Sequence, residues 1–261
     1  MSEVFAIALA SMHQDMGQLD RIAQNLANAS TPGYKRAVAT ARPFTEAIDA
    51  AAAARSPVVL SEAASSAVQG LRGELRVLVD GRPGTLRVTG QPLDLALEGE
   101  GYFEVATPSG TAYTRQGTFA LDAQGRLVTG SGYAVLGVGG EIRLTTRTPI
   151  IDASGRIAEP DAASNASALG NVAQLRVVRF EKGTQLRQLG DGLLVPTQGA
   201  TAHADPSTLI RQGTLENSNV SSLQEMIQLI QTSRHFESMQ KIVQGYDDLL
   251  STSIRKLGDL S

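Results

Sequence analysis

The residues that could carry out chemistry are few in this chain, and they form no recognisable catalytic set. His13, His203 and His235 lie far apart and match no spacing typical of metal ligands. Asp247 and Asp248 are adjacent on a helical pattern, so their side chains point in different directions and cannot cooperate as acid and base. A catalytic acid–base pair could still arise from two carboxylates that are distant in sequence and are brought together by folding. We predict no catalytic residue and no metal site.

Glycines and cysteines narrow the chemistry further. The glycine-rich stretch 137–140 is followed by a strand pattern and by no Lys-Ser or Lys-Thr, so it lacks the helix N-terminus that a phosphate loop needs. The chain has no cysteine, which excludes disulfides, thiolate metal sites and cysteine nucleophiles. We therefore expect no cofactor and no small-molecule substrate.

Composition limits the classes of partner. The chain has 261 residues, with 23 Lys and Arg against 26 Asp and Glu, a balance that argues against a dedicated nucleic-acid binder. It has no apolar run of the ~18 residues that a membrane-spanning helix needs, so we expect no membrane insertion. The N-terminus lacks the basic and apolar regions of a secretory signal, so we expect no cleaved signal peptide.

The two ends of the chain have helical patterns. From residue 220 to about 257, apolar residues recur in steps of three and four, with no proline. Such a helix would be ~55 Å long at ~1.5 Å per residue. Its apolar positions, which we predict to form an assembly interface, are Met226, Leu229, Ile230, Phe236, Met239, Val243, Tyr246, Leu250 and Leu257.

The N-terminal pattern is more regular. Its apolar residues alternate steps of four and three over roughly three heptads, as in the seam of a coiled coil. Pro32 forbids continuation of this helix. The seam, which we also assign to the assembly interface, consists of Phe5, Leu9, Met12, Met16, Leu19, Ala23 and Leu26.

Each helix has an apolar face that is unfavourable in water, at roughly 25 cal/mol per Å² of apolar area. The nearest partner for either helix is the other terminus. The C-terminal helix is the longer, so part of its stripe stays uncovered after pairing and favours a partner outside the chain. The alternative is that both helices pack on the middle of the chain as ordinary core helices.

The middle of the chain is predicted to be an all-β domain. From residue 71 onward, short strand patterns alternate with turns that contain glycine. The hexapeptide 122–127 recurs as 152–157, and its Asp-x-x-Gly core is typical of a hairpin connection. By contrast, residues 37–70 are rich in Ala and Ser with little periodicity, which indicates a linker or adaptable segment that follows a type II turn at Pro32-Gly33.

These patterns predict an α+β fold class, in which long N- and C-terminal α-helices pair in a coiled-coil-like manner beside a central all-β domain. The predicted domains are an N-terminal helical segment 1–36, the linker 37–70, the β-rich domain 71–212 and a C-terminal helical segment 213–261. The two helical segments would together form one inner coiled-coil domain.

Three stretches resemble a known family. Residues 25–35, Asn-Leu-Ala-Asn-Ala-Ser-Thr-Pro-Gly-Tyr-Lys, look like the signature of the bacterial flagellar rod and hook family, and residues 215–220 resemble its C-terminal signature. The middle stretches 92–103 and 113–119 are also similar. The matching motif residues are Asn25, Leu26, Ala27, Asn28, Thr31, Pro32, Gly33, Tyr34, Leu215, Glu216, Ser218, Asn219 and Val220.

The resemblance implies a structural subunit of the flagellar basal-body rod, a hollow drive shaft in the periplasm that serves motility. Its implied partners are other rod and hook-family axial subunits and the flagellar type III export apparatus. In the family the terminal helices pair into an inner layer, the β-rich middle forms an outer layer, and the ends stay disordered until assembly.

Two alternatives stay open. Residues 29–33 and 233–237 resemble the proximal, F type of rod subunit more than the distal, G type. A reading of a different class is a periplasmic enzyme or carbohydrate-binding β domain, acting on the cell wall and carrying oligomerising helical ends. That reading needs a cleft with convergent carboxylates or aromatic side chains, and the chain has no tryptophan.

Overall fold

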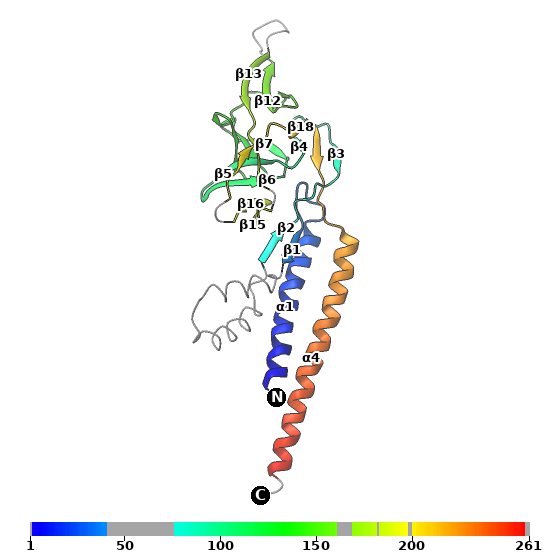
Figure 1. Cartoon of the computed structure of the whole chain (residues 1–261). Coiled ribbons are helices and arrows are strands. Elements are labelled where there is room, and N and C mark those ends of the chain that lie inside the picture. The colour runs from blue at the N-terminus through cyan, green and yellow to red at the C-terminus, as the bar shows by residue number, and fades with distance from the viewer. Residues whose placement is uncertain (1, 41–75, 161–168, 182, 198–199, 259–261) are drawn as a thin grey trace, which may run out of the picture. The chain divides into compact units, whose positions relative to one another are not determined.

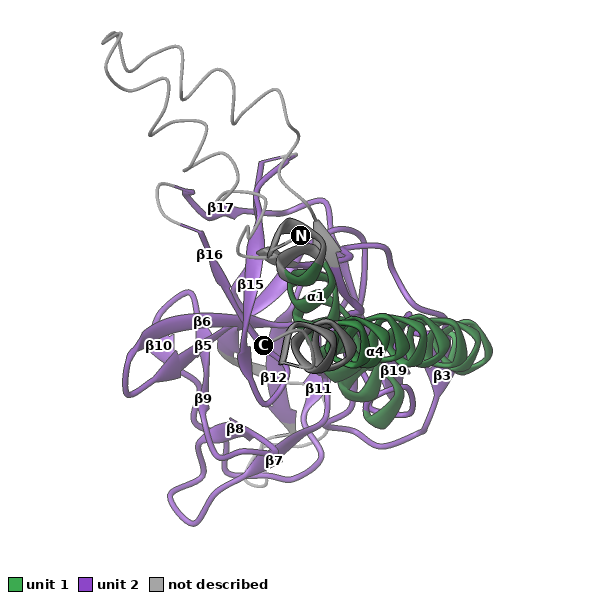
Figure 2. Cartoon of the chain, turned by 90° about the horizontal axis from the view of Figure 1, so that it is seen from below, with its two compact units in different colours: residues 1–27, 39–76, 221–261 green, residues 28–38, 77–220 purple. Residues whose placement is uncertain are grey.

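The structure is a computed structural model that describes residues 2–40, 76–160, 169–181, 183–197 and 200–258. Within these residues lie nineteen strands and two helices, α1 (Ser2–Ala27) and α4 (Ser222–Gly258) (Figure 1). Contacts divide the chain into two compact units (Figure 2). Residues 1–27, 39–76 and 221–261 form the helical unit, and residues 28–38 and 77–220 form the β unit.

The predicted fold class is wrong in its helical part. The described chain is mostly β, and its two helices, of 26 and 37 residues, match a coiled-coil pair only in part. The helices contact each other and run antiparallel, because Phe5 meets Tyr246 and Asn25 meets Glu225. However, several of the residues buried along α1 and α4 are polar, unlike a regular apolar seam. The central β domain is present as predicted.

The buried face of α1 also differs from the predicted seam. The row of heptad positions that begins at Ala8, and continues through Asp15 and Ile22, is buried. The predicted row that begins at Leu9, and continues through Met16, is exposed. Both rows have the same seven-residue spacing, so periodicity cannot distinguish them. The bulkier apolar row was expected to face the other helix, but the buried row is the one whose polar member, Asp15, has a partner on α4.

The β unit contains a ten-stranded sheet. Its strands are β5 (Tyr102–Thr107), β6 (Gly110–Thr114), β7 (Phe119–Leu121), β8 (Leu127–Thr129), β9 (Ala134–Gly137), β10 (Gly140–Glu141), β14 (Val177–Arg179), β15 (Leu186–Gly190), β16 (Leu193–Pro196) and β17 (His203–Ala204). Seven of them follow the order β15-β16-β6-β5-β9-β8-β7. The others extend it, with β10 on β9, β14 on β5 and β17 on β14.

Four smaller sheets hold the other strands. One joins β11 (Ile150–Ile151), β12 (Arg156–Pro160) and β13 (Leu169–Gln174). The three pairs are β4 (Leu95–Glu98) with β18 (Leu209–Gln212), β3 (Leu86–Val88) with β19 (Thr214–Glu216), and β1 (Ala37–Thr40) with β2 (Arg76–Val79). Strands β18 and β19 therefore lie late in the sequence yet pair with β4 and β3, near the start of the β unit.

The main core lies around β5. This strand pairs with β6 along one edge and with β9 and β14 along the other, so it is the central strand of the large sheet. Phe103 and Val105 on β5 are fully buried, and the Phe103 ring meets Phe119 edge-on with 5.1 Å between centroids. Burial of these large side chains supplies the main stabilising term of the unit.

The repeated Asp-x-x-Gly sequences form two matching hairpin turns, as predicted. The Asp122 carboxylate accepts hydrogen bonds from the backbone N–H of Gln124 and Arg126 between β7 and β8. Asp152 accepts the equivalent bonds from residues 154 and 156 between β11 and β12. The glycine of each turn has a positive φ, 73° at Gly125 and 82° at Gly155. Each aspartate thus supplies the acceptor that fixes a tight turn.

The short strand patterns expected from residue 71 onward are confirmed, within the described residues, by β2 to β9. Strands β1, β10, β13, β15, β17 and β19 were not predicted, because their sequences are very short or show little alternation of apolar and polar residues. The predicted linker 37–70 falls mainly on residues 41–75, outside the described residues. The predicted boundaries at residues 36, 70 and 212 stay predictions.

Candidate functional site

The candidate site begins with the turn that follows α1. The Tyr34 N–H donates to the Thr31 carbonyl oxygen at 3.3 Å, and Gly33 has a φ of 72°. These are features of a type II turn with proline and glycine at its two central positions, as predicted for Pro32 and Gly33. The turn belongs to the β unit, so a segment next to the N-terminal helix is part of the fold of the chain's middle.

Gly33 lies directly against the backbone of the β unit. Its N–H donates to the Glu216 carbonyl oxygen at 2.7 Å. A Cβ atom at this position would lie 2.4 Å from the backbone carbon and oxygen of Arg115, closer than any real contact. Position 33 therefore requires glycine for two reasons: its φ is positive, and the Arg115 backbone lies too close for a side chain.

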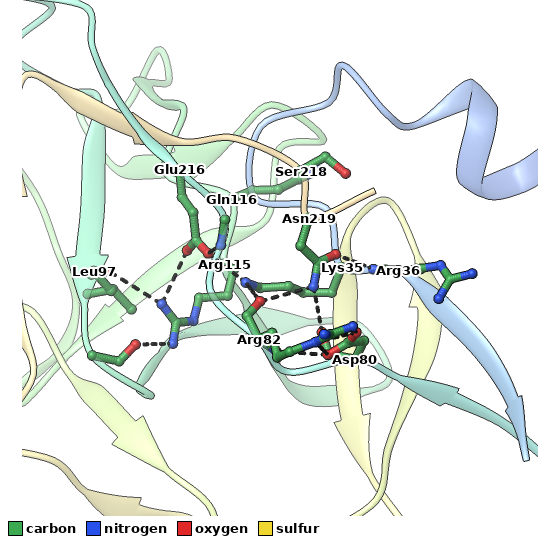
Figure 3. Close-up of polar contacts among 12 residues, drawn as sticks. Lys35, Arg36, Asp80, Arg82, Leu97, Arg115, Gln116, Glu216, Ser218 and Asn219 are labelled. Atoms are coloured by element: carbon green, nitrogen blue, oxygen red, sulfur yellow. Dashed lines mark hydrogen bonds and ion pairs between the residues drawn. The ribbon is translucent and has the colours of Figure 1, made fainter. Parts of the chain in front are cut away.

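A buried ion cluster follows two residues later. The Lys35 ammonium lies 2.5 Å from Glu216 Oε1, and Arg115 Nη1 lies 3.2 Å from Glu216 Oε2 (Figure 3). All three side chains are 1% exposed. One carboxylate thus lies between two cations in a place that excludes water. We call Lys35, Arg115, Glu216 and Asn219 the polar clasp.

Backbone groups supply further hydrogen bonds to the ion cluster, although the buried Nε of Arg115 has no hydrogen-bond partner among the described residues. Lys35 also donates to the Arg82 carbonyl oxygen at 2.9 Å, and the Gly84 N–H donates to Glu216 Oε1 at 2.7 Å. Arg115 donates to the carbonyl oxygens of Leu97 and Gly99. Such extra hydrogen bonds are needed because desolvation of buried charges otherwise exceeds their mutual attraction.

Burial and charge act in opposite directions on Lys35. Burial lowers the pKa of the Lys35 ammonium below the usual lysine range, and the adjacent Glu216 carboxylate opposes that shift. The Arg115 guanidinium additionally lies over the Tyr102 ring, with 5.1 Å between its central carbon and the ring centroid. That contact stabilises a buried cation without needing a second carboxylate.

Asn219 completes the clasp on its open side. Its amide nitrogen donates to the carbonyl oxygens of Asp80 and Arg82, at 2.9 and 3.0 Å. Its amide oxygen accepts the N–H of Arg36 at 2.7 Å. Asn219, near the C-terminal end of the β unit, thereby connects two segments from the first third of the chain (Figure 3).

The structure brings some of the family motif residues together and separates others. Glu216 and Asn219 belong to the clasp, and Gly33 donates its N–H to the Glu216 carbonyl oxygen. By contrast, Asn25, Leu26 and Ala27 belong to α1 in the helical unit. The others lie along the same two segments of the chain: Asn28, Thr31, Pro32, Tyr34, Leu215, Ser218 and Val220.

Sequence reasoning did not identify Arg115 and Gly84 as members of this site. Arg115 is a charged residue directly after an apolar strand pattern, and Gly84 follows a proline in an ordinary turn signal. An arginine at the end of a strand is usually solvated, so neither position stands out without the fold. A Cβ on Gly84 would lie 1.9 Å from the Asn217 carbonyl oxygen, which explains the glycine there.

The predicted assembly residues on α1 differ in exposure. Leu9 is 56% and Met16 is 55% exposed, and Phe5 and Ala23 are exposed as well. The half-buried members are Met12, Leu19 and Leu26. Phe5 nevertheless contacts Tyr246 on α4. Leu9, Met16 and Ala23, which follow one another at seven-residue spacing, form an exposed stripe on α1.

On α4 the predicted residues divide between two faces. The half-buried ones, which continue the spacing of the buried Glu225 and Thr232, are Leu229, Phe236, Met239, Val243 and Tyr246. Met226 and Ile230 are half-exposed on the opposite face, together with Leu223 and Ile227, which the prediction did not include. The side chains of Leu250 and Leu257 lie outside the described residues.

The histidines and one surface pocket are the other places where chemistry could occur. His13 is exposed, His203 lies 3.8 Å from Glu181 on the surface, and His235 pairs with Asp15. Among the described residues, no cluster of three metal-ligating side chains occurs. A shallow pocket of about 390 Å³ has one aromatic residue and no carboxylate in its lining, which consists of Gln91, Pro92, Leu93, Phe119, Ala120, Leu121 and Arg147. This pocket lacks the convergent groups that the cell-wall reading requires.

Comparisons with known proteins give a consistent result. The family described as "Flagellar hook protein FlgE/F/G D1 domain" matches residues 96–167, and "Flagellar basal body rod FlgEFG protein C-terminal" matches residues 211–256. The flagellar basal-body rod protein FlgG of Bacillus subtilis is 33% identical, over 93% of this chain and 94% of its own length.

Relatives of a second type are about equally similar. The flagellar basal-body rod protein FlgF of Escherichia coli is 30% identical over 95% of both chains. FlgF of Mesorhizobium japonicum is 29% identical over the whole of both chains. Within the described residues, no helix is long and apolar enough to cross a membrane.

Proposed function

Because the chain belongs to the flagellar basal-body rod protein family, as a structural rod subunit, we propose that it is the proximal rod subunit of F type. The observation that carries the subunit function is similarity along nearly the whole chain to rod proteins of both types. The choice of F type rests on residues 29–33 and 233–237, which resemble that type, and on the several FlgF relatives.

The proposed partners are other rod and hook-family subunits and the flagellar type III export apparatus. We propose that the subunit acts in the periplasm and is exported without a cleaved signal peptide. In this proposal the chain neither catalyses a reaction nor binds nucleic acid, membrane lipid or a small-molecule substrate. The members of this family are structural proteins of the flagellar rod and hook, which supports a non-enzymatic role.

The proposed contacts with other subunits use the apolar side chains that the helix pair leaves outside. Leu9 and Met16 on α1, and Met226 and Ile230 on α4, are each at least half-exposed. Exposed apolar side chains that cluster on one face are unfavourable in water and are common in interaction surfaces. These residues are therefore the part of the predicted assembly interface most accessible to a neighbour.

The second candidate is the distal, G type. It is favoured by the FlgG relative with 33% identity. The two types occupy different parts of the rod. A proximal subunit must therefore assemble before the distal rod can be added.

The experiment that tests the proposal is deletion of the gene in the source bacterium, followed by isolation of basal bodies and detection of their rod and hook proteins. An F-type subunit predicts that distal rod and hook proteins are both absent and that a plasmid copy restores them. Basal bodies that contain a proximal rod without its distal part would support the G type. Normal swimming of the deletion strain would contradict the rod function itself.

A further inference from the structure

The two helices of the helical unit meet through three side-chain pairs that share one register. Phe5 contacts Tyr246 with 5.9 Å between ring centroids, and the Asp15 carboxylate lies 2.7 Å from His235 Nδ1. Asn25 Nδ2 donates to a carboxylate oxygen of Glu225 at 3.2 Å. Advancing along α1 from pair to pair moves back along α4 by nearly the same number of residues, so all three pairs describe one antiparallel alignment.

The Asn25–Glu225 pair is the more deeply buried of the two polar pairs. Asn25 is 2% and Glu225 is 1% exposed. A buried polar group that loses its hydrogen-bond partner costs roughly 1–3 kcal/mol, and a charged group costs more. Any alignment of the helices that separates Asn25 from Glu225 therefore loses this hydrogen bond between a buried amide and a buried carboxylate.

The Asp15–His235 pair adds a second constraint at the middle of α1. The Asp15 side chain is 10% exposed, and the His235 side chain is 49% exposed. A slip by one heptad would place His235 opposite Ile22 in one direction or Ala8 in the other, and both are apolar and buried. In the first of these alignments Asp15 would also face Ile242.

The apolar residues between the helices lack this discrimination. Leu229, Phe236, Met239, Val243 and Tyr246 follow heptad spacing along α4, so a slip of seven residues would again set apolar side chains against apolar side chains. Hydrophobic contact alone would then permit several alignments of similar energy. Buried polar residues within a helix seam are known to select one alignment at a cost in stability.

We propose that the Asn25–Glu225 and Asp15–His235 pairs confine α1 and α4 to a single antiparallel register. A slip of seven residues keeps the same helix faces in contact, so the register determines how the exposed apolar side chains of α1, Leu9 and Met16, are aligned along the helix axis with those of α4, Met226 and Ile230. That consequence rests on the proposed rod function, because those side chains are the proposed contacts with neighbouring subunits. The register itself is a property of the isolated chain.

The test is a distance measurement between two spin labels on the full-length chain. The natural sequence has no cysteine, so Gln14→Cys and Gln244→Cys, both at exposed positions, give two unique labelling sites. These sites are offset along the helix axes, so a slip by one heptad changes their axial separation by ~10 Å at ~1.5 Å per residue. Pulsed electron paramagnetic resonance resolves such a change.

The natural pairs should give one narrow distance. Replacing both pairs with leucine (Asn25→Leu, Glu225→Leu, Asp15→Leu and His235→Leu) should leave the helices formed and add a second population, at a distance whose axial component differs by ~10 Å. A single unchanged distance in this variant would overturn the proposal. Loss of its helical circular dichroism would also overturn it, because the pairs would then hold the helices together rather than select their alignment.

Two further variants sharpen the result. Exchanging partners, with Asp15→His and His235→Asp, keeps a polar pair at the same level and should keep a single distance. His13→Leu with Gln240→Leu adds apolar side chains at exposed positions of the same helices and should also keep one distance. A second distance in either variant would contradict the proposal. Because all distances come from the purified chain, failure here would leave the rod function untouched.

Discussion

At the scale of single residues, Glu216 is the side chain on which the polar clasp converges. Its two carboxylate oxygens contact Lys35, Arg115 and the Gly84 N–H, and none of the three charged side chains is more than 1% exposed. Removal of one member of a buried charged group leaves the others uncompensated in a place that water does not reach. The stability of the β unit should therefore depend strongly on this residue.

Replacing Glu216 with leucine is expected to destabilise the β unit by at least ~3–5 kcal/mol, because it leaves two buried cations without a carboxylate. Lys35→Met should cost less, since Arg115 continues to pair with Glu216. Urea unfolding of the full chain, followed by near-ultraviolet circular dichroism of the buried tyrosines, measures both changes. Arg211→Ala, which removes an exposed ion pair with Glu98, is the control and should cost at most ~1 kcal/mol. Equal effects of all three changes would contradict the role of the clasp.

Gly33 and Gly90 form a matched pair for a second prediction. Both have positive φ, 72° and 75°, but only Gly33 has neighbouring atoms where a Cβ would lie. Gly90→Ala should cost roughly 1–2 kcal/mol, the ordinary penalty of a left-handed residue with a side chain. Gly33→Ala should cost clearly more, because its methyl group would collide with the Arg115 backbone. The same urea titration compares them, and similar losses for both would rule out the close approach as a cause.

Asp205 should contribute to the acid sensitivity of the β unit. Burial alone would raise the pKa of its carboxyl group, but hydrogen bonds from Ser207 and Thr208 outweigh burial and lower the pKa below the usual aspartate value. A lowered pKa in the folded state gives stability that is present above the unfolded pKa of ~3.9 and is lost as the pH falls through the folded pKa.

Asp205→Asn should therefore be less stable than the natural chain at neutral pH, and the difference should shrink below about pH 4. Unfolding free energies between pH 2 and pH 7 check this. Glu100→Gln, at an exposed position, is the control and should run parallel to the natural chain. If the free energy of unfolding of Asp205→Asn differed from that of the natural chain by the same amount at every pH, the charge of the Asp205 carboxylate would not be the cause of the difference.

At the scale of elements, α1 and α4 each have more apolar surface than their mutual contact covers. On α4 the inward face carries Phe236 and Tyr246, while Met226 and Ile230 are half-exposed on the opposite face. A helix with two apolar faces can pack against its own partner and a neighbour at once. This arrangement suits a subunit that completes its packing only in a polymer.

Substitutions on the exposed faces should separate assembly from folding. Leu9→Asp and Ile230→Asp place a charge on side chains that are 56% and 54% exposed in the isolated chain, so the fold should lose little stability. A charge in an apolar contact between subunits is costly, and we expect soft-agar swimming to be abolished. His13→Asp, on an exposed position of α1, should swim normally. If the Leu9→Asp and Ile230→Asp variants both swam normally, these two positions would not belong to the interface between subunits.

At the scale of the whole molecule, the chain divides into units that do not follow the sequence order. The β unit includes residues 28–38 and 77–220, so a short N-terminal segment folds with the middle of the chain. Lys35 and Gly33 lie in that segment and contact Glu216 near the other end of the β unit. The clasp thus closes the β unit between its first and last segments.

This division predicts an order of cleavage by trypsin in the dilute purified chain. Arg234 and Lys241 are exposed on α4, whereas Lys35 is buried in the clasp. If the helices await neighbouring subunits, cleavage at Arg234 and Lys241 should be rapid and cleavage after Lys35 slow, because proteolysis needs local opening of the chain. Mass spectrometry of timed samples gives the order. Early cleavage after Lys35 would mean that the clasp does not hold in solution.

The sequence by itself was sufficient for the features that depend on local patterns. Helical spacing located both terminal helices, and Asp-x-x-Gly and Pro-Gly signals located turns whose glycines have the expected positive φ. The motif residues near Gly33 and Glu216 identified the family, which the comparisons confirm. These features need only neighbours in sequence, because backbone geometry and periodicity determine them.

Only the tertiary structure decided which residues meet across long separations. Two adjacent heptad rows on α1 have equal spacing, and the buried one is the row whose Asp15 finds His235 on α4. Arg115 becomes part of a site only because folding brings Glu216 beside it, 101 residues away in sequence. Partners of buried polar groups depend on the arrangement of distant segments, and a local pattern does not encode that arrangement.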